Sequence, residues 1–392
     1  MSNPNRLVPS PTITLGVMGG GQLGRMFVHA AQRMGYCTAV LDPDAQSPAG
    51  RVSHHLIPTG YTDPQGLAQL AATSAAITTE FENVPAAALA DLARYKPVAP
   101  AAECVAIAQD RAREKAHFMA CGVPVAPHAV ITTAAELAAI NADLLPGILK
   151  TARMGYDGKG QVRVATPAEL AAAWADLKNV PCVLEKMLAL ELECSVIVAR
   201  GADGVCVNLP VQRNLHRGGI LAVTEVYEGN VPSAPANAAV IAAKSIANGL
   251  QYVGVLCVEF FVLADGSLVV NEMAPRPHNS GHYSIEACDV SQFELQVRTL
   301  AGLPLTQPRL HSPAIMLNIL GDLWPRDAAG AVCGEPDWAA VLALPGAHLH
   351  LYGKANPALG RKMGHLTLTG ATVEQVRATA LQAAAVLGIA PF

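Results

Sequence analysis

The chain has 392 residues, of which 51% are hydrophobic and 15% are charged. This length predicts two to three folded domains, and the composition excludes a disordered protein. The net charge of −4 gives no reason to expect nucleic-acid binding, and the absence of a membrane-length apolar run or a signal peptide predicts a cytoplasmic protein without a membrane partner. The nine cysteines form no CxxC pattern, so we expect buried thiols.

The first predicted elements form a nucleotide- or phosphate-binding turn. An apolar strand at 13–18 is followed by the glycine turn 19–24 and by helical periodicity as far as Met34. The glycines allow a ligand to approach the backbone. The start of the helix, at Gly21-Gln22-Leu23, offers unpaired N–H groups to an anion.

Two further strands of this unit end in acidic residues. The strand 37–41 ends at Asp42, where a dinucleotide enzyme would carry its ribose-binding acid, so an NAD-dependent dehydrogenase is an alternative here. The strand 75–79 ends at Glu80, at the sheet edge where ligands collect, although an ordinary acid at a helix start is the alternative. We predict a Rossmann-like N-terminal domain at 1–105.

The second glycine loop lies between two strands. Residues 146–150 form a strand that ends in Lys150, and residues 162–164 form the next strand. The segment Gly155–Gln161 between them suits a mobile flap that lays backbone N–H groups and Lys159 over phosphates. A flexible hairpin built on its Asp-Gly pair is the alternative.

A strand that runs into a linker follows at 182–188. A linker between two lobes presents a backbone edge and apolar side chains to an adenine base, and Glu193 can accept hydrogen bonds from ribose hydroxyls. Acids exposed to solvent are the alternative interpretation.

Two apolar strands, which begin at Val255 and Leu268, are joined by a turn containing Asp265-Gly266. Each strand carries a carboxylate, Glu259 and Glu272. If the strands are antiparallel, the two carboxylates lie close together and require a cation, for which Mg²⁺ is the natural candidate. A surface hairpin with an acidic face is the alternative.

Basic and polar groups gather in two later loops. The loop 276–282 follows Glu272 directly and is dense in groups that bind anions. In the small unit that begins near residue 301, a glycine-bounded turn carries Lys354, Arg361 and Lys362, which suit a phosphate or an acidic intermediate. A solvated basic hairpin is the alternative.

Together these stretches resemble the ATP-grasp superfamily, and within it the 5-(carboxyamino)imidazole ribonucleotide synthases of purine biosynthesis. The motifs that carry the resemblance span nearly the whole chain: Gly19–Met26, Glu80–Val84, Gly155–Gln161, Asn271–His282 and Gly360–His365. The resemblance implies an α/β and α+β chain with an ATP-grasp fold. Its implied parts are the Rossmann-like domain at 1–105, an ATP-grasp domain at 106–300 with a mobile flap subdomain at about 121–190, and a small C-terminal domain at 301–392.

The resemblance also implies the reaction. ATP phosphorylates bicarbonate to carboxyphosphate, and the amine of 5-aminoimidazole ribonucleotide captures its carboxyl group, with ADP and phosphate as the other products. ATP and Mg²⁺ are the implied cofactors, and a homodimer is the implied assembly.

The site residues follow from the resemblance position by position. The implied ATP-binding residues are Arg111, Lys150, Gly155, Tyr156, Asp157, Gly158, Lys159, Gly160, Gln161, Glu185, Lys186, Met187, Leu188, Glu193, His216, Asn271 and Glu272. The implied metal ligands are Glu259 and Glu272. The implied ribonucleotide-binding residues are Gly21, Gln22, Leu23, Glu80, Tyr156, Lys159, Lys354, Arg361 and Lys362. The implied catalytic residues are Arg276, His278, Asn279 and Lys354, the first three of them at the bicarbonate and carboxyphosphate position.

Two alternatives share parts of this pattern. Another ATP-grasp ligase, such as the formate-dependent glycinamide ribonucleotide transformylase, would keep the ATP site but differ in the loops 276–282 and 354–365. A nucleotide-binding sensor would not need both acids of the predicted metal pair. The chain departs from many relatives at Thr79, where a tyrosine is expected, and at 324–336, which looks like a loop insertion without an assignable role.

Overall fold

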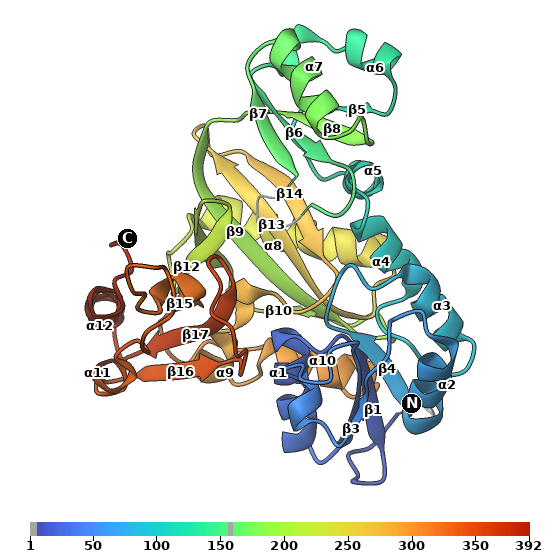
Figure 1. Cartoon of the computed structure of the whole chain (residues 1–392), viewed down its shortest axis with the longest axis vertical. Helices are drawn as coiled ribbons and strands as arrows, with labels where there is room; N and C mark the ends of the chain where they lie inside the picture. The colour runs from blue at the N-terminus through green and yellow to red at the C-terminus, as the bar shows by residue number, and fades with distance from the viewer. Residues whose placement is uncertain (1–5, 156–159) are drawn as a thin grey trace.

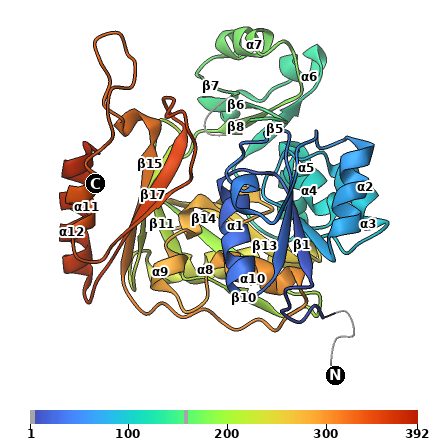
Figure 2. The same cartoon turned by 60° about the horizontal axis from the view of Figure 1, so that its bottom comes forward.

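A computed structural model of the chain describes residues 6–155 and 160–392. Its N-terminal unit is a four-stranded parallel sheet in the order β3-β2-β1-β4 with helices beside it (Figures 1 and 2). The elements of this unit are β1 (Thr14–Met18), α1 (Gln22–Arg33), β2 (Cys37–Leu41), β3 (His55–Ile57), α2 (Pro64–Thr73), β4 (Ala76–Thr79) and α3 (Ala86–Ala93). Because β1 and β4 are parallel neighbours, the loops that follow them leave the same edge of the sheet.

Short sequence signals define several helix ends. Asp63 precedes α2 and accepts a hydrogen bond from the N–H of Gly66, while Pro64 occupies the first helical position. Asp110 caps the helix α5 (Arg111–Ala120) in the same way, and it separates α5 from α4 (Ala102–Ala108). These two helices lead from the N-terminal unit into the next one.

A small antiparallel sheet in the order β5-β8-β6-β7 stands at the top of Figure 1. Its elements are β5 (His128–Ile131), α6 (Ala134–Ala138), β6 (Gly147–Thr151), β7 (Gln161–Val164), α7 (Pro167–Asp176) and β8 (Cys182–Lys186). The predicted glycine flap joins β6 to β7. Four of its residues lie outside the described part of the chain, namely Tyr156, Asp157, Gly158 and Lys159.

The largest sheet has nine strands and crosses the middle of the molecule. Its order is β14-β13-β9-β11-β12-β15-β17-β16, with β10 paired to β9. The strands are β9 (Leu190–Arg200), β10 (Cys206–Asn208), β11 (Gln212–Arg217), β12 (Ile220–Val226), β13 (Gly254–Leu263), β14 (Leu268–Ala274), β15 (Ala314–Leu320), β16 (Ala347–Leu351) and β17 (Lys362–Thr369). The helices of this part are α8 (Ser233–Gly249), α9 (Ser284–Ala287), α10 (Gln292–Leu300), α11 (Trp338–Leu342) and α12 (Val373–Leu387).

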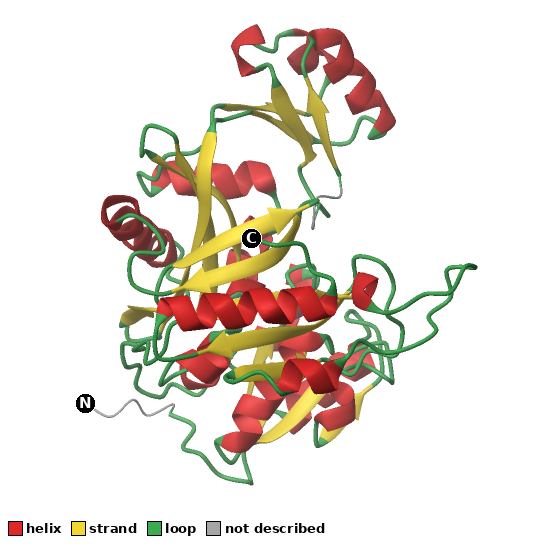
Figure 3. Ribbon diagram, turned by 90° about the vertical axis from the view of Figure 1, so that its left-hand side faces the viewer, coloured by secondary structure: helices red, strands yellow, loops and turns green. Residues whose placement is uncertain are grey.

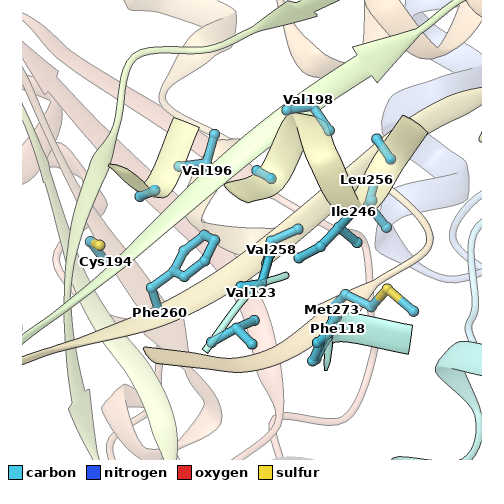
Figure 4. Packing of buried hydrophobic residues seen from close by; sticks show 14 of the residues in the cluster. Phe118, Val123, Cys194, Val196, Val198, Ile246, Leu256, Val258, Phe260 and Met273 are labelled. Atoms are coloured by element: carbon cyan, nitrogen blue, oxygen red, sulfur yellow. The ribbon is translucent and has the colours of Figure 1, made fainter. Parts of the chain in front are cut away.

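The main core lies between this sheet and α8. Val196 and Val198 of β9 and Leu256 and Val258 of β13 meet Ile246 of α8, and all five side chains are fully buried (Figure 4). Burial of this apolar surface holds the central hairpin in place.

The C-terminal strands continue the same sheet, because β12 pairs with β15. Helix α12 packs on β15 and β17 and lies across the molecule in Figure 3. Thr372 caps the start of α12, and Gly388 ends it at φ +70°. Helix α10 packs against α1 of the N-terminal unit, and Leu23 of α1, Phe293 of α10 and Tyr352 of the C-terminal part belong to one buried cluster that links these three parts. Among the described residues, we find no helix that is long and apolar enough to cross a membrane.

Candidate active site

A cleft of about 890 Å³ opens between the three sheets. Most of the predicted site residues line it, although they come from all three parts of the chain. Those that line it are Gln22, Leu23, Glu80, Arg111, Lys150, Gly155, Gln161, Glu185, Lys186, Met187, Leu188, Glu193, His216, Glu259, Asn271, Glu272, Arg276, His278, Asn279, Lys354, Arg361 and Lys362. Gly21 and Gly160 are described but do not line the cleft.

The two acids of the central hairpin are direct neighbours. Strands β13 and β14 are antiparallel, and Glu259 pairs with Glu272 across them. The pairing then skips Asn271, which is the extra residue of a β-bulge. In a regular strand Asn271 and Glu272 would face opposite sides, whereas here both line the cleft. The bulge therefore adds an amide oxygen to a pair of carboxylates.

Each acid of this pair also has a basic partner. Arg111 donates a hydrogen bond of 2.9 Å to Glu272, and His278 Nε2 lies 2.9 Å from Glu259 Oε1. Burial disfavours the charged form of Glu259, but the adjacent His278 outweighs it and lowers the pKa of Glu259 to about 2. Glu259 is thus kept available as an anion in the cleft that it shares with Glu272.

A buried group of two lysines and one acid lies on the flap side of the cleft. Glu185 forms ion pairs with Lys150 at 2.9 Å and with Lys115 at 3.0 Å. Burial opposes ionisation of Glu185, but the two lysines keep its pKa below the ordinary value. Lys150 also donates a hydrogen bond of 3.5 Å to Asn271, so this group contacts the central hairpin.

A partly buried pair lies at the predicted ribose position. His216 Nδ1 lies 2.6 Å from Glu193 Oε2. Burial works against protonation of His216, but the hydrogen bond with Glu193 raises the pKa of the histidine.

The loop after β14 presents a cation and an unsatisfied amide. Arg276 forms an ion pair with Glu82 of the N-terminal unit, and this arginine opposes the effect of burial and lowers the pKa of Glu82 to about 2. Asn279 is 7% exposed, and neither its amide nitrogen nor its amide oxygen has a hydrogen-bond partner among the described residues. A buried amide in this state costs free energy unless a ligand or water completes its hydrogen bonds.

The first glycine turn is held by two acids. Gly20 N donates to Asp42 at 2.7 Å, and Gly21 N donates to Glu80 at 2.8 Å. A Cβ atom at Gly21 would lie 2.6 Å from a Glu80 oxygen, so only glycine permits this close approach. Burial raises the pKa of Glu80. Asp42, which the dehydrogenase alternative would assign to a ribose, therefore supports the turn itself.

The C-terminal part adds three basic side chains to the cleft, those of Lys354, Arg361 and Lys362. Lys354 Nζ donates to the carbonyl of Lys362 at 2.7 Å, and Arg361 donates to the carbonyl of Asn356 at 2.9 Å. These bonds order the loop between β16 and β17 above the cleft.

Sequence reasoning missed several residues of the site. Glu82 lay inside a recognised motif without a role, whereas Glu114 and Lys115 of α5 carried no local signal. Glu114 accepts a hydrogen bond from the N–H of Met273 at 2.7 Å, and burial raises its pKa to about 8. The one sequence pattern that could have indicated Glu114 and Lys115 is a charged residue on the apolar face of α5.

Comparisons with known proteins agree with this geometry. Three family models match in succession: a ribonucleotide synthetase preATP-grasp domain at 12–109, an ATP-grasp domain at 116–293, and a phosphoribosylaminoimidazole carboxylase C-terminal domain at 314–379. The fold and the site thus define an ATP-grasp ligase, and the predicted fold class is confirmed.

The relatives narrow the class further. The N5-carboxyaminoimidazole ribonucleotide synthase of Brucella melitensis is 44% identical over 360 residues, which cover 91% of this chain and 96% of that protein. The synthase of Bacillus subtilis is 40% identical over 358 residues, covering 91% of each chain. The chain belongs to the N5-carboxyaminoimidazole ribonucleotide synthase family, and the prediction of an ATP-dependent ligase of purine biosynthesis is confirmed.

Solved structures show the same fold over the whole chain. The enzyme from Staphylococcus aureus complexed with ADP aligns with a TM-score of 0.87 at 35% identity, covering 97% of this chain and 100% of that one. The enzyme from Aspergillus clavatus in complex with ADP and 5-aminoimidazole ribonucleotide aligns with a TM-score of 0.86 at 32% identity, covering 96% and 99%.

Proposed function

We propose that this chain uses ATP and bicarbonate to carboxylate 5-aminoimidazole ribonucleotide in the cleft described above. The observation that carries the proposal is the meeting of three sets of groups from three parts of the chain: the acidic hairpin, the anion-binding loop after it, and the basic loop of the C-terminal part. The Aspergillus clavatus relative, described in complex with ADP and 5-aminoimidazole ribonucleotide, supports the choice of substrates.

In this proposal ATP lies between the small sheet and the central hairpin. Lys150 and Arg111 face the phosphates, and Glu193 accepts hydrogen bonds from the ribose hydroxyls. The backbone of Glu185–Leu188 meets the adenine. The flap Gly155–Gln161, including Tyr156 and Lys159, closes over the phosphates and excludes water from the reacting groups.

The donor set of the central hairpin fits Mg²⁺. Glu259, Glu272 and Asn271 offer hard oxygen atoms side by side, which is the chemistry that Mg²⁺ prefers. A bound Mg²⁺ would neutralise charge on the β- and γ-phosphate oxygens of ATP.

The loop after the hairpin suits bicarbonate and carboxyphosphate. Arg276 supplies a fixed positive charge. Asn279 has no hydrogen-bond partner among the described residues, so its amide N–H can donate to an oxyanion and its amide oxygen can accept from the hydroxyl of bicarbonate. His278 follows Arg276 in the same loop, and its Nε2 contacts Glu259. These groups hold the anionic intermediate next to the amine that captures its carboxyl group.

The substrate ribonucleotide is assigned to the remaining side of the cleft. Glu80, Lys354, Arg361 and Lys362 surround that side, with the start of α1 at Gly21–Leu23 near the phosphate position. In the structure the N–H of Gly21 is bonded to Glu80, so a phosphate bound there would compete with that carboxylate.

The test of the function is ADP release in the presence of bicarbonate, measured with and without 5-aminoimidazole ribonucleotide. We expect release to depend on the ribonucleotide, and we expect formate with glycinamide ribonucleotide not to replace the pair. ADP release that is insensitive to 5-aminoimidazole ribonucleotide would remove the assignment. Family resemblance is the ground for proposing a cytoplasmic homodimer. Sedimentation of the purified protein would test whether it is a dimer.

The metal role is tested by Glu272→Gln. The amide keeps the size of the side chain and can still accept the hydrogen bond from Arg111, so we expect a cooperatively folded protein with no turnover, its melting temperature lowered only by loss of the ion pair with Arg111. Glu228→Gln, at an exposed position, is the matched control and should keep wild-type activity. Near wild-type ATP consumption by Glu272→Gln would contradict the metal assignment.

A further inference from the structure

Two of the recognised motifs end in histidines that the proposed function does not use. His282 closes the loop after β14, and His365 lies on β17 of the C-terminal part. Their rings meet with centroids 4.6 Å apart, and the two residues are 1% and 0% exposed. The ends of the two motifs therefore form a buried contact between the ATP-grasp domain and the C-terminal domain.

On one side, this contact is tied to the basic substrate loop. His365 Nδ1 lies 2.9 Å from the hydroxyl of Tyr352, which is 2% exposed. The Tyr352 ring in turn lies under Lys354, whose Nζ is 5.7 Å from the ring centroid. Lys354 thus contacts a tyrosine that is bonded to His365, besides its bond to the carbonyl of Lys362.

On the other side, the contact is tied to the loop assigned to bicarbonate. The amide nitrogen of Gln292 lies 3.0 Å from His282 Nδ1 and donates to the carbonyl of His278 at 2.8 Å. The amide oxygen of Gln292 accepts from the N–H of His278 at 2.9 Å. His278 itself contacts Glu259 through Nε2. Displacement of His282 would therefore be transmitted to His278.

Burial favours a neutral ring contact. Loss of solvent lowers the pKa of both His282 and His365 well below the ordinary histidine value, so the two rings, whose planes are tilted by 37°, can meet without charge repulsion. His350 of β16 also stacks on His365, with centroids 4.5 Å apart and planes 9° from parallel, and its Nε2 lies 2.6 Å from Glu286 of α9. Rings this close to parallel direct their nitrogens along parallel lines rather than at one point, which favours a packing contact over a metal site at these residues.

We propose that His365 is a positioning residue that sets Lys354, through Tyr352, at a defined place relative to the His278 loop. The inference rests on the proposed function, because it assigns these two loops to the ribonucleotide and to bicarbonate. His365 then affects how the ribonucleotide and bicarbonate are placed relative to each other, while the ATP pocket across the cleft is left unchanged.

The test is a double-mutant cycle with His365→Phe and Tyr352→Phe. Each change keeps an aromatic ring, and therefore the packing, but removes the bond between Nδ1 and the hydroxyl. We expect each variant to raise the KM for 5-aminoimidazole ribonucleotide about five-fold, the size expected for one lost hydrogen bond, and to leave the KM for ATP within two-fold. Because both changes remove the same bond, the double variant should be no worse than either single one.

Two further variants separate positioning from general stability. His365→Asn places an amide near the former Nδ1 and should recover part of the lost KM. His348→Phe is the matched control. His348 lies on the neighbouring strand β16 and its Nε2 likewise lies 3.1 Å from a hydroxyl, that of Thr369, so the change should alter neither KM.

The inference is overturned if the effects of the two changes multiply, if the KM values for both substrates rise together, or if neither changes. A wild-type protein whose ADP release ignores 5-aminoimidazole ribonucleotide would instead remove the proposed function before the variants are compared. The two failures are therefore distinguishable.

Discussion

Glu114 offers a quantitative test of the electrostatics under the cleft. It is 2% exposed, and burial raises its pKa from 4.5 to about 8 although Arg111 lies nearby and opposes the shift. A carboxyl group with a raised pKa in the folded state contributes its full stability below the unfolded value, near pH 4.5, and loses it as the pH rises toward 8. We predict that Glu114→Gln removes this pH dependence, because glutamine stays neutral and can still accept the hydrogen bond from Met273.

The magnitude follows from the two pKa values. One unit corresponds to about 1.4 kcal/mol, so between pH 5 and pH 8 the wild type should lose about 3–4 kcal/mol of unfolding free energy relative to the variant. Urea titrations at both pH values, without nucleotide or divalent ions, measure the difference. Parallel pH dependence in the two proteins would show that Glu114 is already ionised in the native state and would refute the reasoning.

Three other changes test packing and charge. Leu256→Ala opens a cavity in the central core and should cost about 2–5 kcal/mol of unfolding free energy, seen as a lower urea midpoint; an unchanged midpoint would contradict the assigned core. Gly281→Ala places a Cβ against Gln292 and should lower the free energy of unfolding by about 1–3 kcal/mol. It should also reduce activity, because Gln292 is hydrogen-bonded to the His278 loop. A fully active variant would show that Gln292 does not support this loop. Glu82→Gln should lower the free energy of unfolding at pH 7 by about 2–3 kcal/mol because it breaks the ion pair with Arg276. This loss should shrink as the pH falls from 4.5 toward 2, where wild-type Glu82 becomes protonated. A loss of stability that is constant with pH would exclude the ion pair as its cause.

Local patterns were sufficient for the elements that make the site. Two apolar runs on either side of the Asp265-Gly266 turn indicated the central hairpin, and β13 and β14 are paired with Glu259 opposite Glu272. The glycine turn after β1 likewise precedes a helix, as predicted. Such features depend on residues close in sequence, so a single chain without its fold is enough to indicate them.

Other features depend on contacts between distant residues. The bulge at Asn271 leaves no mark in the sequence, yet it turns a third oxygen donor into the cleft. The partners of Arg276 and Glu185 are Glu82 and Lys115, which lie on other elements of the chain. Local patterns could not indicate these pairings, because packing of separate elements brings the residues together.

The amino-acid sequence alone thus determined the class of fold and the segments that line the cleft, because glycine turns and apolar strands act over a few residues, and the resemblance of its motifs determined the ligase family. The tertiary structure alone decided which acid meets which base, which carboxyl groups are buried enough to change their pKa, and which histidines of two domains meet. The physical reason is that burial and charge pairing are properties of the assembled elements, and each depends on residues that the chain places far apart.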